Sequence, residues 1–240
     1  MAGMIVFNGT VLEQVAPVKI VDIRVSPIQM TAVARQRPVT WGADFVRMTG
    51  GSRTVAIEFA LLTDDQETRQ NQLAAITRWA RSEKPEKLML PNRRGMYLEA
   101  MCTALPEPSL RQWWESKLRI VFTTYDNPYW TSVAEKSIAC GTAFVALGDA
   151  PPLMRIERTL SSAVSSTQTY GNGSESMSFS AIPAGDMVID LNRQTAAVTS
   201  GTTTTSIMGN YSFASSFLIP RTGSQTITGT GTVKWRERWD

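Results

Sequence analysis

Histidine, the side chain that most often transfers protons in enzymes, does not occur among the 240 residues of this chain. Without it, neither a Ser-His-Asp triad nor a Cys-His pair can form, and zinc loses its commonest ligand. The only thiols are Cys102 and Cys140. Two distant cysteines make no metal site by themselves. Two small buried hydrophobic side chains are favoured over a disulfide, in keeping with a protein folded in a reducing cytosol.

The acidic residues have simpler explanations than acid–base catalysis. Asp64, Asp65 and Glu67 stand where a helix begins, and carboxylates are favoured at the positive end of a helix. Asp186 and Asp190 lack the dense oxygen spacing of a calcium loop, so turn and strand-surface roles are favoured for them.

The segment Gly50-Gly51-Ser52-Arg53 lacks the lysine and the following helix of a phosphate-binding loop. We therefore predict no catalytic, cofactor-binding or metal-binding residues, and no enzymatic activity. The net charge of +3 is small for this length, and no basic run carries interleaved aromatic residues. Specific binding to nucleic acid is therefore not expected. Membrane insertion is not expected either, since no apolar run approaches the length of a span.

Strands with one inserted helix are predicted for the first half of the chain. Residues 18–25, 55–61 and 117–122 alternate apolar and polar side chains, which is typical of half-buried strands. Between them we predict a helix over Asp64–Ser82, capped by Asp64 with Glu67 three residues on. Its apolar stripe, Leu73, Ile76 and Trp79, is expected to pack on the sheet. Residues 87–90 and 95–102 then form a hairpin around Pro91–Gly95.

The second half is rich in Ser and Thr and indicates several short strands. Period-two alternation occurs over residues 153–157, 177–181, 187–191 and 227–235. Short strands broken by Gly, Pro and Asn-Gly favour a β-sandwich. Tyr170–Ser174 and Ser200–Ser206 are interpreted as loops. We predict a mainly β chain: an N-terminal β-sandwich or barrel domain over residues 1–132, with one inserted helix and one β-hairpin, followed by a compact sandwich over residues 133–240.

Two pairs of residues are candidates for subunit contacts. Neighbours on a strand point to opposite faces, so one indole of Trp113-Trp114 would leave the core. It either packs under the preceding loop or contacts another subunit, and the sequence does not choose between these. Arg93-Arg94, at the predicted hairpin tip, is interpreted as a solvated turn, with a ring contact as the second interpretation.

Several segments, in their order along the chain, resemble the distal tail protein (Dit) family of long-tailed, siphovirus-type bacteriophages. The similar parts of that family are a helix-to-hairpin stretch, an interdomain junction, the entry into an outer sandwich, and the later strands and closing turn of that sandwich. The segments are Trp79-Ala80 with Lys87–Leu90 and Gly95–Glu99, Phe122 with Asp126–Tyr129, Gly148–Ile156, Ala184–Asp190 and Phe217–Gly223.

The resemblance implies that residues 1–132 form a hexameric ring continuing the tail tube, and that residues 133–240 form a galectin-like sandwich outside it. It implies a virion structural protein of the phage tail tip, made in the host bacterial cytoplasm. Expected partners are further copies of the chain, the tail-tube protein, and tail-tip, baseplate or receptor-binding proteins that serve host adsorption. No cofactor is implied. Sugar binding does not follow, because the histidine of a galectin sugar site is missing.

Two other functions remain open from the sequence. A tail-tube or other baseplate structural protein would share the first half, although a bare tube subunit would lack the second sandwich. A carbohydrate-binding module is the alternative from a different class. It would require exposed aromatic side chains, and the candidates are Tyr170, Tyr211 and Trp239.

Overall fold

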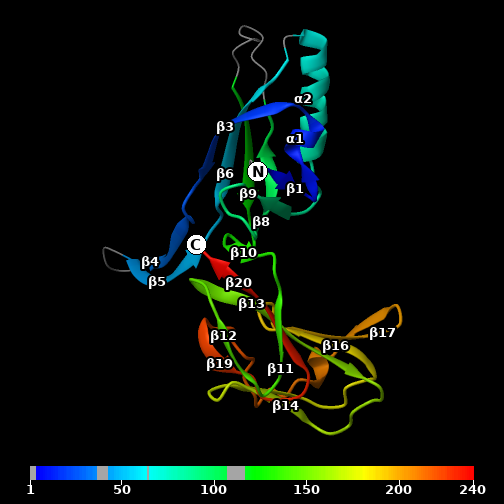
Figure 1. Cartoon of the computed structure of the whole chain (residues 1–240). Helices are drawn as coiled ribbons and strands as arrows, with labels where there is room; N and C mark the ends of the chain where they lie inside the picture. Colours follow the sequence, from blue (N-terminus) through cyan, green and yellow to red (C-terminus); the bar gives the residue numbers. More distant parts are fainter. Residues whose placement is uncertain (1–3, 37–42, 64, 107–116) are drawn as a thin grey trace. The chain divides into compact units, whose positions relative to one another are not determined.

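A computed structural model describes residues 4–36, 43–63, 65–106 and 117–240. The chain divides into two compact units (Figure 1): unit 1 comprises residues 1–130 together with Asp240, and unit 2 comprises residues 131–239. Strands dominate both units, which confirms the prediction of a mainly β protein. No helix in the described ranges is long and apolar enough to cross a membrane.

Unit 1 contains a seven-stranded antiparallel sheet. Its strand order is β3, β6, β9, β8, β7, β1, β2. These strands are β1 (Val6–Phe7), β2 (Thr10–Val11), β3 (Val18–Val25), β6 (Thr54–Leu61), β7 (Glu86–Met89), β8 (Met96–Ala104) and β9 (Leu118–Thr124). The short helix α1 (Leu12–Val15) follows β2, the helix α2 (Gln66–Ala80) follows β6, and β10 (Trp130–Ser132) begins at the last residue of this part of unit 1.

The predicted strands form because one of their faces is buried. In β6, Val55, Ile57 and Phe59 are buried between the flanking strands β3 and β9. The same period of two places Ile120 and Phe122 of β9 in the core. Register is fixed by this pattern, because a slip of one residue would expose every buried side chain.

The N-cap of helix α2 lies one residue after the predicted one. The N-cap is Asp65, whose carboxylate accepts a hydrogen bond from the backbone N–H of Thr68 at 2.7 Å. The hydrogen bond with the Thr68 side chain, and after it the bond from the Thr68 backbone N–H, hold the pKa of Asp65 below its usual value. Asp64, the predicted cap, lies outside the described residues.

The predicted apolar stripe of α2 does pack on the sheet. Ile76 is fully buried, and Leu73 and Trp79 are half-buried. The Trp79 ring lies edge-on to Phe7 of β1 and Phe122 of β9, with ring centroids 5.7 and 6.0 Å apart. Phe7 and Phe122 contact each other at 4.8 Å, so three aromatic rings join α2 to the sheet.

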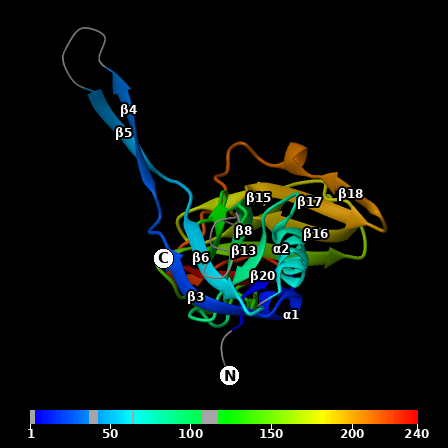
Figure 2. The ribbon, with the colours of Figure 1, turned by 90° about the horizontal axis from the view of Figure 1, so that it is seen from above.

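A second hairpin, not predicted from the sequence, follows β3. Strands β4 (Met30–Gln36) and β5 (Ala43–Gly50) pair antiparallel in a two-stranded sheet of their own. Figure 2 shows this hairpin reaching away from β3 and β6. Its base is closed by backbone bonds from the Gly51 N–H to the Gln29 carbonyl (2.7 Å) and from the Gln29 N–H to the Ser52 carbonyl (3.2 Å).

Unit 2 is a two-layer sandwich. One layer is an antiparallel sheet of strand order β18, β17, β16, β13, β20, β11. The other consists of two small two-stranded sheets, β12 with β19 and β14 with β15. The bounds are β11 (Lys136–Ala139), β12 (Ala143–Ala146), β13 (Ala150–Leu160), β14 (Gln168–Gly171), β15 (Ser176–Phe179), β16 (Gly185–Asp190), β17 (Thr195–Ser200), β18 (Thr203–Ser206), β19 (Gly223–Thr226) and β20 (Thr232–Trp239), with a 3₁₀ turn η1 (Met208–Asn210).

The core of unit 2 lies between these layers. Ile156, Ile189 and Val233 of the large sheet meet Phe144 of β12 and Phe179 of β15 in one buried cluster. The predicted alternation over residues 153–157 and 187–191 marks the strands that supply the large-sheet side of this core. The sandwich expected from the short strands is therefore present.

Three predictions for unit 2 were wrong in detail. Ser200–Ser206 is not a loop, because β17 and β18 pair across it. Tyr170 and Gly171 belong to β14, and the Tyr170 side chain is 1% exposed. Residues 227–235 do not form one strand: Gly229 and Gly231 have φ of +123° and +133°, and β20 begins only at Thr232.

Replacing Gly185 with alanine is expected to destabilise unit 2 by several kcal/mol, on the order of 2–4. Gly185 opens β16 at a φ of +137°, and a Cβ there would stand 2.4 Å from the carbonyl oxygen of Thr199. Gly201 is the matched control, since it also has positive φ (+60°) but no atom within 4 Å of its added Cβ. Thermal unfolding should show a much larger loss for G185A than for G201A. Equal losses would show that backbone strain alone, and not the contact with β17, sets the cost.

Candidate functional site

No concentrated catalytic centre is found in the described part of the chain. There, no three His, Cys, Asp or Glu side chains lie close enough to hold a metal ion. Cys102 and Cys140 are free, and burial raises the pKa of each thiol, which keeps both protonated near neutral pH. The candidate functional features are therefore surfaces.

The acidic residues considered above serve local structure. The Asp186 carboxylate accepts a hydrogen bond from the Thr159 hydroxyl at 2.6 Å, across the β13–β16 pair. Asp190 accepts bonds from the backbone N–H groups of Asn192 and Arg193, both at 3.0 Å, and so closes the turn after β16.

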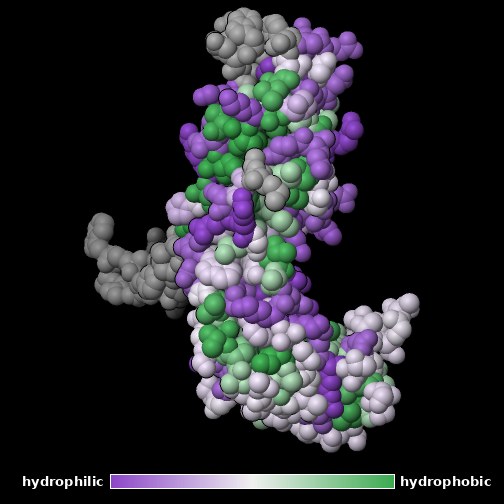
Figure 3. Space-filling view, viewed as in Figure 1, coloured by the Kyte–Doolittle hydropathy of each residue, from purple (hydrophilic) through white to green (hydrophobic). Residues whose placement is uncertain are grey.

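The first surface is the β3 side of unit 1. In the described residues β3 pairs with β6 alone, so it is an edge strand. None of its residues is fully buried, and Val21 is exposed. Figure 3 shows apolar side chains gathering over β3, β6 and β9 on this face of unit 1. An exposed edge with half-exposed apolar side chains is suited to contact another protein chain.

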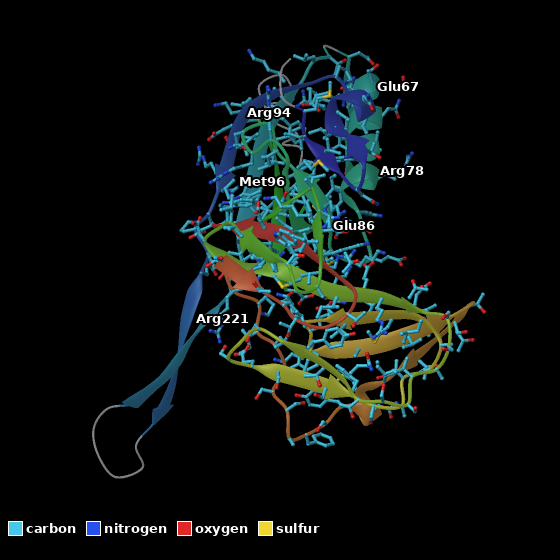
Figure 4. All side chains as sticks on the ribbon, turned by 60° about the horizontal axis from the view of Figure 1, so that its bottom comes forward. Glu67, Arg78, Glu86, Arg94, Met96 and Arg221 are labelled. Atoms are coloured by element: carbon cyan, nitrogen blue, oxygen red, sulfur yellow. The ribbon has the colours of Figure 1, made fainter. Side chains whose placement is uncertain are left out.

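The second surface is the turn between β7 and β8, which contains Arg93 and Arg94 and which the sequence predicts as a hairpin tip. The turn is held by two backbone bonds of 3.2 Å, from Arg93 N–H to the Leu90 carbonyl and from Met96 N–H to the Arg93 carbonyl. Both arginines are exposed. The Arg93 guanidinium lies 5.6 Å from the ring centre of the buried Trp130, a cation–π contact that orients it. Arg94 and Met96 are labelled in Figure 4.

The outer face of α2 is polar. Glu67 and Arg78 are exposed and point outward from the helix in Figure 4. Between α2 and the β1–α1 segment lies a cavity of about 370 Å³ lined by eight residues, among them Trp79, whose indole N–H donates to the Thr10 carbonyl at 3.0 Å. Trp113 and Trp114 lie outside the described residues, so the subunit contact considered for them stays a prediction.

Unit 2 carries a small aromatic surface on the segment after η1. Phe213 is 92% exposed, and its ring stands edge-on to Tyr211, which also contacts Phe179 and Phe217. Near it, the Glu175 carboxylate accepts bonds from Ile219 N–H and from Arg221, which is labelled in Figure 4. This surface was not predicted; Phe213 lies in a Ser-rich stretch with no periodicity to single it out.

The three aromatic candidates for sugar binding do not come together. Tyr170 is buried in β14, and its hydroxyl donates to the Thr230 carbonyl at 3.1 Å. Tyr211 is half-buried in the aromatic cluster, and Trp239 ends β20. The arrangement therefore offers no aligned aromatic platform made of these residues.

A network of charged side chains crosses β13 and β20 of unit 2. Arg155 makes a two-pronged contact with Glu135 at 2.8 and 2.9 Å and a further bond with Glu157 at 2.6 Å. Lys234 contacts Glu157 at 2.7 Å, and Arg236 contacts Glu135 at 3.4 Å. Burial alone would raise the pKa of Glu157, but the bonds from Lys234 and Arg155 outweigh it and lower that pKa.

Acid is therefore expected to weaken unit 2 through Glu157. A carboxyl whose folded pKa is depressed stabilises the fold above its unfolded pKa, near 4.5, and loses that contribution as pH falls through the lower folded value. The variant E157Q should be less stable than the parent at pH 7, by about 0.5–1 kcal/mol for a half-exposed network. The difference should shrink below pH 4 when urea midpoints are compared. A difference that is constant from pH 7 to pH 3 would contradict the assignment.

The chain is similar in structure to proteins of phage tails. No family model and no curated protein matches the sequence. The crystal structure of phage SPP1 Dit, described as a paradigm of the hub adsorption apparatus in phages that infect Gram-positive bacteria, superposes with a TM-score of 0.72 at 11% identity, over 99% of each chain. Chains of the phage p2 baseplate in its activated conformation, with Sr or Ca, match at TM-scores of 0.47 and 0.48, with 11% and 10% identity, over 92% of this chain and 90% of theirs. The chain therefore shares the fold of SPP1 Dit over 99% of its length.

Proposed function

We propose that this chain is a structural protein of a bacteriophage tail, where copies of it assemble into a closed ring at the distal end. The ring joins the tail tube to the tip or baseplate. The observation that carries the proposal is the likeness in fold to SPP1 Dit, which extends over 99% of both chains and so includes both units. Fold alone does not fix function, so the surfaces must support it too.

A closed ring requires two different, complementary surfaces on every subunit. Unit 1 offers two candidates that differ in kind. One is the β3 edge with its half-exposed apolar side chains, and the other is the β4–β5 hairpin. A two-stranded hairpin is at best marginally stable by itself in water. Docking against a second copy would stabilise it, and we assign the hairpin this role.

Unit 2 is proposed as the outward-facing part that carries host-adsorption components. It has a core of its own, so it does not depend on ring contacts to fold. Its exposed Phe213 is suited to anchor a partner protein, because exposed aromatic side chains dominate many interfaces. A bare tail-tube subunit would not need this second sandwich, which favours the distal ring over the tube.

A carbohydrate-binding module is the weaker alternative. Its expected aromatic platform is lost because Tyr170 is buried and Tyr211 is packed within its own cluster. No observation favours an enzymatic role: the sequence has no histidine, and in the described residues no three His, Cys, Asp or Glu side chains gather into a metal site. Partners under the proposal are copies of this chain, a tube protein and tip or baseplate proteins.

Light scattering of the full-length protein tests the assembly. A hexamer would have a mass of about 158 kDa, six times the chain mass of 26.4 kDa, as expected for cyclic symmetry of that order. Residues 1–132 should assemble when expressed alone, and residues 133–240 should remain monomeric. A monomeric full-length chain at high concentration, even when mixed with its tube protein, would contradict the proposal.

A further inference from the structure

Arg53 is an arginine buried at the edge of the unit 1 sheet. It stands directly before β6 and is only 3% exposed. Its backbone is locked to the end of β9: the Arg53 N–H donates to the Thr124 hydroxyl, and the Thr124 N–H donates to the Arg53 carbonyl, both at 2.9 Å. Thr124 is itself fully buried, so the position of this guanidinium is set by the fold.

The guanidinium is poorly satisfied for a buried charge. Arginine has five N–H donors. Nη2 contacts the carboxylate of Asp240, whereas Nε and Nη1 are buried without a hydrogen-bond partner in the described part of the chain. Buried arginines are ordinarily paired and fully hydrogen-bonded, because desolvating the charge is costly. Three donors with no acceptor therefore indicate a place for an anion.

A cavity of about 270 Å³ adjoins Arg53, and its lining fits an anion. It is lined by Val25, Ser26, Pro27, Arg53, Asn92, Arg93, Trp130 and Asp240. Arg93 is held over the Trp130 ring at the rim and has no carboxylate against it among the described contacts. Two guanidinium groups and the side-chain carboxylate of Asp240 thus line one cavity; that carboxylate contacts Arg53, and its side chain is 65% exposed. Arg53 therefore keeps buried N–H donors that face this lining without an acceptor.

We propose that Arg53 and Arg93 form a binding site for a carboxylate group, and that Asp240 is its internal occupant. An aspartate or glutamate side chain of another protein chain can displace Asp240. The incoming carboxylate has two oxygens and matches the guanidinium fork with two parallel hydrogen bonds, whereas Asp240 makes one. Exchange therefore gains a hydrogen bond and releases Asp240 to water, where it is already more than half exposed.

The site stands independently of the ring proposal, because its ligand chemistry follows from these residues alone. Its test uses the full-length protein and N-acetyl-L-aspartate as the probe, followed by saturation-transfer difference NMR, which detects weak ligands on large proteins. We expect the probe to bind the parent protein and to bind D240N about tenfold more tightly. A tenfold change corresponds to Asp240 occupying the site in about nine-tenths of the parent molecules, which leaves about one-tenth of the sites open to the probe.

Variants of the two arginines complete the test. R53Q should lose binding, and R93Q, a change at an exposed rim residue, should weaken it about threefold to tenfold because one charged contact is removed. N-acetyl-L-asparagine should not bind, since it lacks the charge. Equal binding in the parent, D240N and R93Q would overturn the site. The site would also be overturned if sulfate bound as tightly as the aspartate probe, because that would indicate a general anion-binding surface.

The same variant distinguishes the sources of the carboxylate. If a second copy of this chain provides it, D240N should raise the mass measured by light scattering at a fixed concentration. If a different protein provides it, the mass of D240N should equal that of the parent while probe binding still tightens. If R53Q does not fold, R93Q and D240N still decide, because both residues are solvent-accessible in the described structure.

Discussion

Replacing the β4–β5 hairpin with two glycines is expected to leave the chain folded and to abolish its self-assembly. Strands β4 and β5 form their own two-stranded sheet, and the hairpin base is closed by the hydrogen bond between Gln29 and Gly51. Because Gln29 and Gly51 are adjacent in space, a short linker can join them without disturbing β3 or β6. Light scattering of this variant should then give the monomer mass at concentrations where the parent assembles. For a hexameric parent, the measured mass would fall sixfold.

A surface change in unit 2 is the matched control for this deletion. F213S removes the most exposed aromatic side chain described, which has no role in the proposed ring, and should leave the assembled mass unchanged. Circular dichroism should show that both variants keep their strands. Full assembly without the hairpin would assign the ring contacts to other parts of unit 1, and loss of assembly in F213S would assign them to unit 2.

Replacing Phe122 with alanine should produce the largest loss of stability in unit 1. Phe122 is fully buried, and its ring packs against those of Phe7 and Trp79, with ring centroids 4.8 and 6.0 Å apart. Removing a buried phenylalanine costs about 3–5 kcal/mol, because transfer energy is lost and a cavity remains. This is a large part of the roughly 5–15 kcal/mol that stabilises a typical domain.

Hydrogen exchange measured by mass spectrometry locates that loss. Peptides from β6 and β9 should exchange much faster in F122A, whereas peptides from β13 and β16 in unit 2 should be unaffected. Tyr125 lies three residues on and is exposed, so Y125A is the control and should change little. Equal acceleration in both units would contradict the division into two separately folded cores.

The strands that the sequence predicts well are those with one buried face. β6 alternates Val55, Ile57 and Phe59 with side chains that point away from its core, and this period identifies it. β18 shows the opposite case. All four of its residues are exposed, so it has no alternation and is held by pairing with β17 alone. Its Ser/Thr run therefore resembled a loop.

The hairpin and the proposed carboxylate site were missed for a related reason. The β4–β5 pair forms a two-stranded sheet of its own, and its residues show no clear period of two in the sequence. Burial of Arg53 depends on its pairing with Thr124, a residue 71 positions away. Composition and spacing do not report such a contact. Arg93, in contrast, was predicted at a turn because Pro and Gly mark it.

Negative-stain electron microscopy of the purified full-length protein tests the ring most directly. We expect closed particles of uniform size with a central hole, and class averages with rotational symmetry, six-fold for the proposed hexamer. The hairpin-deleted chain, imaged beside it, should give only small particles. The proposed ring would be contradicted if the parent chain gave only single compact particles at every concentration imaged, including in samples to which tube protein was added.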